Sequence, residues 1–345
     1  MIDKGNQPKT ETHMTSRIHF SDVQEYVLVT GASGFIGKLL VRALVEDGQH
    51  VTVLTRNPDK TARKFDDTVT CIASLDELPA TQRVDVIINL AGARILGWRW
   101  SAARKRVLRL SRIGTTQKLV SWIAQAAHKP RLLLSASAIG YYGIQAREDT
   151  ALLKEADPPQ AIFMSELCQE WETAAHAASR HGVQVKCMRF GLVLGKEGAL
   201  PMMMLPIRLG LGGPLGDGRQ ALSWIHVEDL LRAIAHLWKM PARPQARDSQ
   251  SDTQDAIETY NFTAPEVVTQ AVFSKTAAHL MHRPCFFPTP AILMRLLLGE
   301  QADLLLEGQR VTSARLQASG FAFTYPDLRS ALENIFRIKE NSAVR

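Results

Sequence analysis

The chain has 345 residues, of which 46% are hydrophobic and 22% are charged, as in ordinary globular proteins. This length is enough for about two domains of ~150 residues each. The 41 Lys and Arg residues and the 34 Asp and Glu residues give a formal net charge of +7. Because this charge is scattered along the sequence, it suits an anionic ligand but argues against a dedicated nucleic-acid-binding protein.

No apolar stretch reaches the roughly 20 residues that a membrane span needs, and no secretory leader precedes the first apolar segment. The four cysteines, Cys71, Cys168, Cys187 and Cys285, form no CxxC pair and no disulfide framework. The ten histidines show none of the spacings of a metal site. We therefore expect a cytoplasmic protein with reduced thiols, no membrane contact and no bound metal.

The first 25 residues are polar and lack an apolar period, which predicts a flexible tail. The apolar run Tyr26–Thr30 predicts a strand, and apolar residues then recur at helical spacing from Phe35 to Leu44, up to a helix end at Gly48. Further strands are predicted at His50–Thr55, Val84–Leu90, Leu132–Ser135 and Val183–Phe190, and helices at Ser101–His128 and Met164–His181. Apolar strands that alternate with helices predict an α/β Rossmann-like fold, a doubly wound parallel sheet covered on both faces.

The pattern changes after about residue 195, where Gly and Pro become dense. We assign residues 26–240 to the dinucleotide-binding domain, with a helix at Val227–Lys239, and expect about 195–225 to contribute to a substrate lobe. Residues 241–256 contain no large apolar side chain, which predicts a mobile surface loop. Residues 257–345 resume an apolar pattern, with a strand at Tyr260–Thr263 and a helix near Val267–His282, and we expect a smaller C-terminal lobe there.

The segment Gly31-x-x-Gly34-x-x-Gly37 lies between the first predicted strand and the first predicted helix. In this context Gly31 permits a tight turn, Gly34 lets the backbone approach a pyrophosphate, and Gly37 lets the helix pack close to the sheet. The amides and dipole at the helix start then face the phosphates. The motif therefore predicts a dinucleotide site.

The second predicted strand ends in Thr55-Arg56-Asn57, where NAD-binding proteins commonly carry a carboxylate for the ribose hydroxyls. Arg56 suits a 2′-phosphate instead, which favours NADP(H) over NAD(H), and an ordinary solvent-exposed arginine is the alternative. Small residues after Asn89 allow a ribose to lie against the backbone. The residues expected to contact the cofactor are Gly31, Ser33, Gly34, Phe35, Ile36, Gly37, Thr55, Arg56, Leu90, Ala91, Gly92 and Ser135.

Several motifs resemble the extended short-chain dehydrogenases/reductases, the group of nucleotide-sugar epimerases and dehydratases. They are Thr30–Gly37, Asn89–Gly92, Ser135–Gly143 and Trp224–Leu230. Phe190–Leu200, Leu211–Leu230, Tyr260–Thr269 and Leu304–Val311 are similar to the atypical "epimerase family" proteins, some of which are labelled cell-division-inhibitor-like. The resemblance covers about Tyr26 to Leu332. It implies a Rossmann fold, an NAD(P) cofactor, a C-terminal domain of unknown function and a homodimer as a candidate assembly.

The resemblance also implies a catalytic Ser and a YxxxK helix turn, in which Lys lowers the pKa of Tyr. Ser137 stands at the Ser position, just before Tyr141 and Tyr142, but YxxxK is missing, since Ile162 and Glu166 align with its Tyr and Lys. An unperturbed Tyr, with a pKa of ~10, needs a neighbouring cation to act as a base. Ser137, Tyr141 and Tyr142 are therefore the catalytic candidates, with stacking or substrate contact as the alternative for the tyrosines.

Two substrate-binding candidates lie further along the chain. Arg219 ends the glycine-rich loop that begins at Gly212, a region that meets the nucleotide part of a substrate in related enzymes, and a surface arginine is the alternative. His226 is predicted to contact substrate or cofactor, or else to cap a helix as a buried histidine. Asp229 is expected to act electrostatically at the helix start.

A run of basic residues surrounds Trp98 and Trp100. It consists of Arg94, Arg99, Arg104, Lys105, Arg106, Arg109 and Arg112. At helical spacing these side chains share no single stripe, so we expect mainly a solvated helix face. Contact with a ligand phosphate and stacking on RNA are the alternatives.

The leading hypothesis is an NADP(H)-dependent oxidoreductase or epimerase that acts on a small molecule, with a nucleotide-linked substrate as a candidate. The second hypothesis is a non-catalytic NADP(H)-binding sensor or scaffold, which the missing Tyr–Lys couple supports. RNA binding through the basic run is the third.

Overall fold

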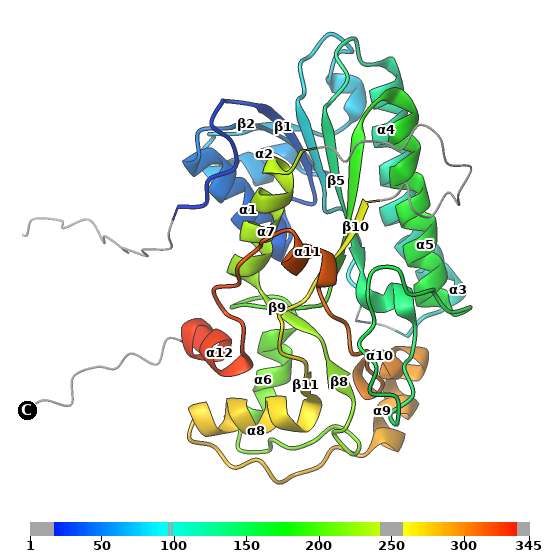
Figure 1. The fold of residues 1–345 in the computed structure, drawn as a ribbon, viewed down its shortest axis with the longest axis vertical. Coiled ribbons are helices and arrows are strands. Elements are labelled where there is room, and N and C mark those ends of the chain that lie inside the picture. Colours follow the sequence, from blue (N-terminus) through cyan, green and yellow to red (C-terminus); the bar gives the residue numbers. More distant parts are fainter. Residues whose placement is uncertain (1–16, 96, 98, 242–257, 337–345) are drawn as a thin grey trace, which may run out of the picture.

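The computed structural model describes residues 17–95, 97, 99–241 and 258–336. Within them, a large parallel sheet with its helices forms one half of the molecule, and a lobe of helices and short strand pairs forms the other (Figure 1). No helix of these residues has both the length and the apolar character needed to cross a bilayer.

The sheet has seven strands in the described part of the chain, in the order β10-β6-β5-β4-β1-β2-β3, and all neighbours run parallel. The strands are β1 (Tyr26–Thr30), β2 (His50–Leu54), β3 (Thr70–Ile72), β4 (Val86–Asn89), β5 (Leu132–Ala138), β6 (Gln184–Phe190) and β10 (Glu258–Phe262). The chain runs outward from β1 through β2 to β3 and then returns to β4 on the other side of β1. Ligands of such sheets bind outside the strand carboxyl ends at this reversal. The predicted fold class is confirmed.

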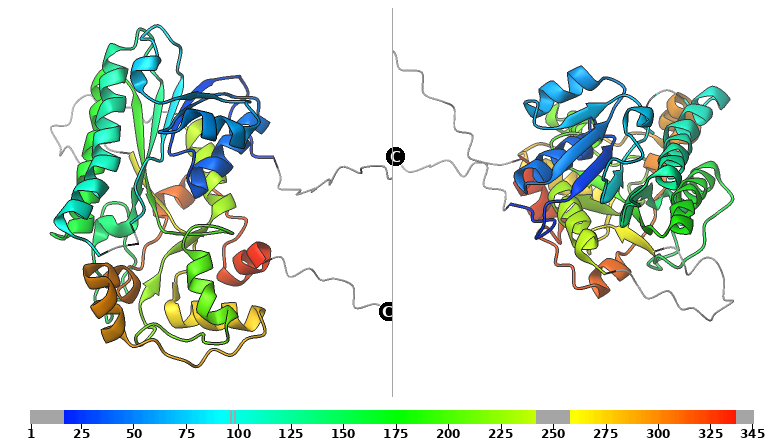
Figure 2. Two further views of the ribbon diagram at one scale, coloured as in Figure 1. Left: turned by 180° about the vertical axis from the view of Figure 1, so that it is seen from behind. Right: turned by 90° about the horizontal axis from the view of Figure 1, so that it is seen from above.

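Helices cover both faces of the sheet because alternate strand side chains point to opposite sides. Val27 and Val29 of β1 pack in one core with α1 (Phe35–Glu46) and α7 (Val227–Lys239). Leu28, between them, packs in the opposite core with α4 (Thr115–Gln125) and residues of α5 (Phe163–His176). The view from above in Figure 2 shows the sheet between these two helical layers. The half is completed by α2 (Pro58–Ala62) and by α3 (Ala102–Arg109), which a π-helical turn over Leu110–Gly114 joins to α4.

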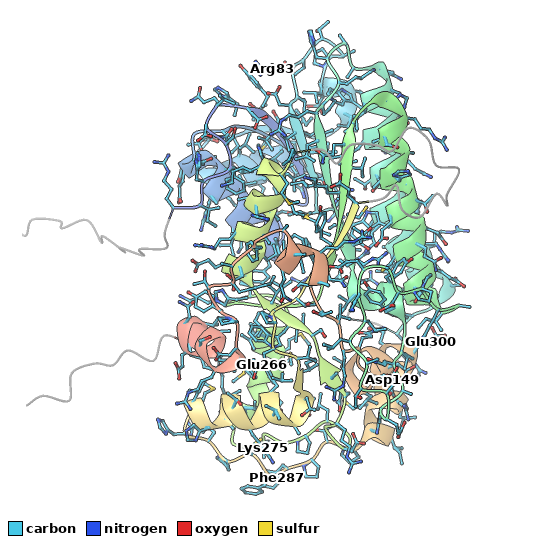
Figure 3. The ribbon with its side chains drawn as sticks, viewed as in Figure 1. Arg83, Asp149, Glu266, Lys275, Phe287 and Glu300 are labelled. Carbon is cyan, nitrogen blue, oxygen red and sulfur yellow. The ribbon has the colours of Figure 1, made fainter. Side chains whose placement is uncertain are left out.

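The lobe has its own core, which includes Leu194, Met204, Trp224, Phe273 and Leu332. Its short strands pair as β7 (Leu192–Leu194) with β9 (Trp224–His226) and β8 (Ala221–Leu222) with β11 (Val268–Thr269). Its helices are α6 (Leu200–Arg208), α8 (Gln270–Leu280), α9 (Ala291–Leu298), α10 (Asp303–Leu306) and α12 (Leu328–Phe336). Figure 3 labels Lys275 and Phe287 at the end of the lobe remote from the sheet.

The parts that the sequence divides at residues 240 and 257 are interleaved in the structure. Strand β10 adds Tyr260 and Phe262 to the edge of the main sheet beside β6. Leu316 of α11 (Ala314–Ala318) is fully buried in the same core. The apolar pattern located these elements but did not reveal their partners, since strand pairing is non-local. The predicted mobile loop, apart from Pro241, lies outside the described residues, and the short strand β3 was not predicted.

Residues 1–16 of the predicted flexible tail lie outside the described part, whereas residues 17–25 contact the rest of the protein. Phe20 is fully buried, and its ring meets that of Trp238 edge-on at 5.5 Å. Its backbone N–H donates to the carboxylate of Asp47 at 2.9 Å. Glu25 accepts hydrogen bonds from Arg131 and from the Trp238 indole, both at 2.7 Å. One buried apolar side chain and several polar contacts order this segment. Because they form no periodic pattern, the sequence did not reveal them.

Candidate cofactor and substrate sites

Two glycines of the turn between β1 and α1, Gly31 and Gly37, have no room for a side chain. Gly31 has φ +74°, and a Cβ there would lie 2.5 Å from the carbonyl oxygen of Leu90. A Cβ at Gly37 would lie 2.3 Å from the carbonyl oxygen of Gly31. Gly34 is the N-cap of α1 and offers no side-chain cap, so the first amides of the helix are left to a ligand. The geometry is that of a phosphate-binding turn.

A cavity of about 310 Å³ adjoins this turn at the carboxyl ends of β1, β4, β5 and β6. Seven of the expected cofactor residues line it, namely Gly31, Gly34, Phe35, Ile36, Gly37, Leu90 and Gly92. Ser137 and Arg112 also line it. We call this space the cofactor cavity.

The remaining cofactor candidates lie outside the lining of this cavity. Ser33 and Arg56 are exposed, Arg56 directly after β2, and Thr55 pairs its hydroxyl with that of Thr61 at 3.0 Å. Ser135 is buried and accepts a hydrogen bond from the Asn89 amide at 3.3 Å. The role of these residues toward a cofactor remains a prediction.

A buried hydrogen-bond network holds the strand ends around the turn. The Thr30 hydroxyl donates to Asn89 Oδ1 at 2.7 Å, and Asn89 Nδ2 donates to the Thr116 hydroxyl at 2.8 Å. The Ala91 N–H donates to the Thr30 hydroxyl at 3.1 Å. These bonds fix the end of β4 against the end of β1, which sets the cavity's shape.

Arg112 corrects the interpretation of the basic run as a solvated face. It is 7% exposed, lines the cofactor cavity, and donates to the carbonyl oxygens of Ala93 at 3.1 Å and Leu108 at 3.3 Å. Its Cζ lies 5.2 Å from the centre of the Trp171 ring, and burial lowers the pKa of Arg112 to about 10. Arg112 lies in a π-helical turn. Side chains in such a turn do not follow the 3.6-residue spacing on which the prediction of a solvated face was based. Arg112 therefore brings a cation to the cavity wall, which agrees with the alternative of ligand contact and not with a solvated face.

Other members of the run are paired at the surface. Arg109 donates to Glu170 at 2.9 Å, and Lys105 forms an ion pair with Glu300 at 2.7 Å. Arg104 donates to the carbonyl oxygen of Arg94. Trp98 lies outside the described residues.

Ser137 is the first residue of a buried network of hydrogen-bonded polar side chains. Its hydroxyl donates to Glu172 Oε1 at 2.6 Å. Arg189 donates from two nitrogens to the two oxygens of the same carboxylate, both at 2.8 Å, and both side chains are almost fully buried. Burial disfavours the charged guanidinium, but the hydrogen bonds and charge of Glu172 outweigh this and raise the pKa of Arg189. The carboxylate is thus held rigidly beneath the serine.

Both candidate tyrosines contact the same arginine. Arg189 Cζ lies 3.3 Å from the ring centre of Tyr141, and its NH1 group donates to the Tyr142 hydroxyl at 3.0 Å. That hydroxyl donates to Asn261 Oδ1 at 2.8 Å. Burial raises the pKa of Tyr141 and raises that of Tyr142 to about 12, more than the arginine lowers them. Both phenols therefore stay protonated at neutral pH, and the Tyr142 hydroxyl is a hydrogen-bond donor.

The structure also places the residues aligned with the missing YxxxK. Ile162 is the N-cap of α5, and Glu166 is half-exposed and lies 3.4 Å from Arg109. The charge that faces the tyrosines is Arg189 from β6. Sequence analysis missed Arg189 and Glu172, although a charged residue within a strand buried on both faces signals a buried pair.

A second cavity, of about 830 Å³, lies between the sheet half and the lobe. Its wall shares Ile95, Ala138, Met164, Phe190 and Gly191 with the cofactor cavity, so the two spaces adjoin. Segments from α5, α6, α8, α9 and α10 complete it. We call it the lobe cavity.

The structure brings neither predicted substrate residue to the lining of these two cavities. Arg219 is exposed. His226 is buried, accepts the Glu228 N–H at Nδ1 as the N-cap of α7, and packs 4.0 Å from the Tyr325 ring. Burial lowers the pKa of His226 to about 4. Asp229 is not only a helix-start charge, because it accepts the N–H groups of Thr324 and Tyr325, both at 2.8 Å.

The four cysteines are unpaired, and burial raises the pKa of Cys168, which lines the cofactor cavity, to about 12. Across the described ranges, no group of three or more His, Cys, Asp or Glu side chains is arranged to hold a metal ion.

A doubly wound sheet with a glycine-rich turn at its reversal point defines the class of α/β proteins with a dinucleotide-binding type of site. Residues 27–249 match the model described as "NAD dependent epimerase/dehydratase family", and residues 289–335 match "Domain of unknown function (DUF1731)". The chain belongs to the NAD-dependent epimerase/dehydratase family, as its motifs predicted.

Individual relatives agree with this assignment. "Epimerase family protein SSP1921" of Staphylococcus saprophyticus is 38% identical over 314 residues, which are 90% of this chain and 99% of the relative. The crystal structure of human epimerase family protein SDR39U1 with NADPH is 32% identical, with a TM-score of 0.76, and the match covers 91% of this chain and 99% of that one. MoeE5 in complex with UDP-glucuronic acid and NAD has a TM-score of 0.69 at 23% identity, covering 90% and 97% of the two chains, a likeness of fold alone.

Proposed function

We propose that the chain binds NADP(H) in the cofactor cavity and acts as an oxidoreductase or epimerase on a small molecule in the lobe cavity. The observation that carries this proposal is the wall that the two cavities share at Ala138, Met164, Phe190 and Gly191. A cofactor reaching that wall from the glycine-rich turn meets a substrate there. When bound, the nicotinamide supplies or accepts a hydride.

The residues present fit such a cofactor. A Cβ at Gly31 or Gly37 would collide with backbone, so the turn keeps its concave form, and the uncapped start of α1 offers amides to phosphates. Exposed Arg56 after β2 supports a 2′-phosphate, as does the NADPH in the human relative's structure. Arg112 adds a buried positive charge on the far wall.

Ser137 is the polar side chain that we assign to the reacting end. We propose that its hydroxyl turns from Glu172 to the substrate oxygen and donates a hydrogen bond to it from Oγ, without giving up its proton, while Arg189 keeps the carboxylate in place. Tyr141 and Tyr142 support this network as protonated, buried groups. Under this proposal, they are positioning residues.

A non-catalytic NADP(H)-binding protein is the second candidate. It is favoured by the Ser137 proton, which points to Glu172, and by the raised pKa values of both tyrosines. With these raised pKa values, neither Tyr141 nor Tyr142 provides the cation-activated phenolate of the missing Tyr–Lys couple.

Calorimetric titration with NADPH and NADH tests the cofactor assignment. We expect tighter NADPH binding and roughly tenfold weaker NADPH binding in Arg56→Ala, with NADH little changed, because a charge-assisted contact is lost. Lys60→Ala, an exposed cation on α2, is the matched control. Failure of both nucleotides to bind would contradict the proposal.

Turnover with Ser137→Ala separates the two candidates. For the enzyme, we expect about a hundredfold loss in kcat with cofactor affinity retained. Cofactor binding without turnover of any tested carbonyl or alcohol would favour the non-catalytic protein.

A further inference from the structure

The lobe cavity is walled mainly by apolar side chains. Aromatic and methionine groups from both halves contribute to it, notably Trp100, Phe163, Met164, Phe190, Met203 and Phe273. Its volume of about 830 Å³ lies within the range of roughly 300–1,000 Å³ for small-molecule sites. Apolar walls favour an apolar ligand by about 25 cal/mol for each Å² removed from water.

The charges around this cavity disfavour a phosphate-bearing ligand. Three carboxylates line it, those of Glu300, Asp303 and Glu307. Among the described lining residues, Lys105 is the single Lys or Arg, and it already pairs with Glu300 at 2.7 Å. Figure 3 labels Glu300 at the level where the sheet half meets the lobe. Asp303 pairs with Arg295, and Glu307 pairs with both Arg295 and Arg147. A diphosphate would therefore find no free arginine in the described wall of the cavity to bind it.

Three amides of the glycine-rich loop at residues 212–218 are bonded within the protein, among them that of Gly218, which donates to the Leu215 carbonyl oxygen at 3.0 Å. The Leu215 N–H donates to Gln270 Oε1, and the Gly216 N–H donates to the Thr289 carbonyl oxygen, both at 2.8 Å. A Cβ at Gly213 would lie 1.9 Å from the carbonyl oxygen of Phe287. The segment at 285–289 thus pairs with the loop and covers it. The close approach of the 285–289 segment therefore explains the glycines of this loop, without the need for a bound nucleotide.

The polar side chains of the wall are also engaged within the protein. Gln270 donates to the Ser274 hydroxyl at 2.8 Å, and the Ser223 hydroxyl donates to the Gln309 carbonyl oxygen at 2.8 Å. Because these polar groups already have partners within the protein, a ligand would be held mainly by apolar contacts.

From these observations we propose that the lobe cavity takes an uncharged, largely apolar molecule that bears a carbonyl or hydroxyl group, and not a nucleoside-diphosphate sugar. This inference rests on the proposed function, because it names the substrate class of the same site. The mouth of the cavity is also apolar. Met202 and Leu211 line the cavity and remain 71% and 55% exposed to solvent, which places them at its opening.

The experiment uses prodan, an uncharged naphthyl ketone whose emission shifts to the blue in apolar surroundings. The full chain with NADP⁺ is titrated with prodan, and medium-chain ketones and UDP-glucose are then added as competitors. We expect saturable binding that the ketones displace and that UDP-glucose leaves unchanged. Oxidation of NADPH in the presence of the same ketones is recorded separately.

Two pairs of variants distinguish the cavity from the exposed apolar surface around it. Met202→Asp and Leu211→Asp place a carboxylate at the mouth and should weaken prodan binding roughly tenfold. Leu205→Asp and Leu209→Asp are the controls, because these leucines are 57% and 66% exposed but do not line the cavity. NADPH affinity should change less than twofold in all four variants.

Each outcome bears on a separate statement. Displacement of prodan by UDP-glucose, equal loss in the control variants, or no saturable binding would overturn the assignment of an apolar substrate. Prodan binding that follows the expected pattern without oxidation of NADPH by any ketone would leave this inference standing and contradict the oxidoreductase proposal.

Discussion

The two cavities that meet at the end of β5 are built in different ways. The cofactor cavity is small, framed by glycines and backbone, and underlain by the buried ion pair of Glu172 and Arg189. The lobe cavity is larger, and it is walled mainly by apolar side chains from segments as distant as Ile95 and Leu305. Function in the first depends on exact backbone and polar geometry, whereas the second depends on shape and apolar area. Substitutions should therefore have contrasting effects in the two regions.

The largest contrast is expected between two carboxylate-to-amide changes. Glu172→Gln leaves Arg189 buried without its charged partner, and we expect the free energy of unfolding to fall by ~3–5 kcal/mol. Glu300→Gln, at the rim of the lobe cavity, removes a half-exposed ion pair and should cost less than ~1 kcal/mol. Denaturant unfolding of both variants measures the difference. Equal effects would show that the buried pair is not the stronger determinant.

His226 lines neither cavity but contacts elements of both halves of the molecule. It caps α7, which packs on the sheet, and its ring packs on Tyr325 beside the lobe. Its pKa is about 4 in the folded protein against an ordinary value of 6.5, so its contribution to stability is fully present above pH 6.5. As the pH falls from 6.5 to about 4, the unfolded chain takes up a proton that the folded chain does not. We expect a loss of up to ~3 kcal/mol over this window.

His226→Asn provides the comparison for that pH dependence. Asparagine still accepts a hydrogen bond at an N-cap but does not titrate. Unfolding free energies measured from pH 7 to pH 4 should fall less steeply in the variant than in the wild type. Identical slopes would assign the pH dependence to other groups.

At the glycine-rich turn, we expect a substitution that weakens cofactor binding while it changes the stability of the protein only slightly. Gly34→Ala adds a Cβ that meets only the Gly31 carbonyl oxygen, at 3.3 Å, so stability should fall by no more than ~1 kcal/mol. The methyl group blocks close approach of a pyrophosphate, and NADPH affinity should drop about tenfold. Gly114→Ala is the control, because its nearest contact would be 3.9 Å away. Unchanged NADPH affinity in Gly34→Ala would place the phosphates elsewhere.

The smallest effect is expected at Arg219. Its side chain is exposed outside the lining of both cavities, so Arg219→Ala should change prodan affinity and NADPH affinity less than twofold. The titrations described above measure both. A clear loss of binding would mean that this arginine folds over the ligand and that an anionic substrate group must be reconsidered.

The sequence by itself determined the elements whose signals are local. Strand β1, the glycine-rich turn and helix α1 are contiguous, so apolar spacing and three glycines were enough to locate the turn. The helix at Val227–Lys239 was predicted with the bounds that the structure has, because its apolar face has a clear 3.6-residue period.

Only the tertiary structure decided how distant segments meet. The pairing of β10 with β6, the burial of Arg112 and Arg189, and the segment at 285–289 that covers the Gly213 loop all depend on contacts between residues far apart in the chain. A sequence pattern reports which side of an element is apolar, but not what that side faces. The lobe cavity is made wholly of such contacts, and for that reason its apolar character became visible only in the folded protein.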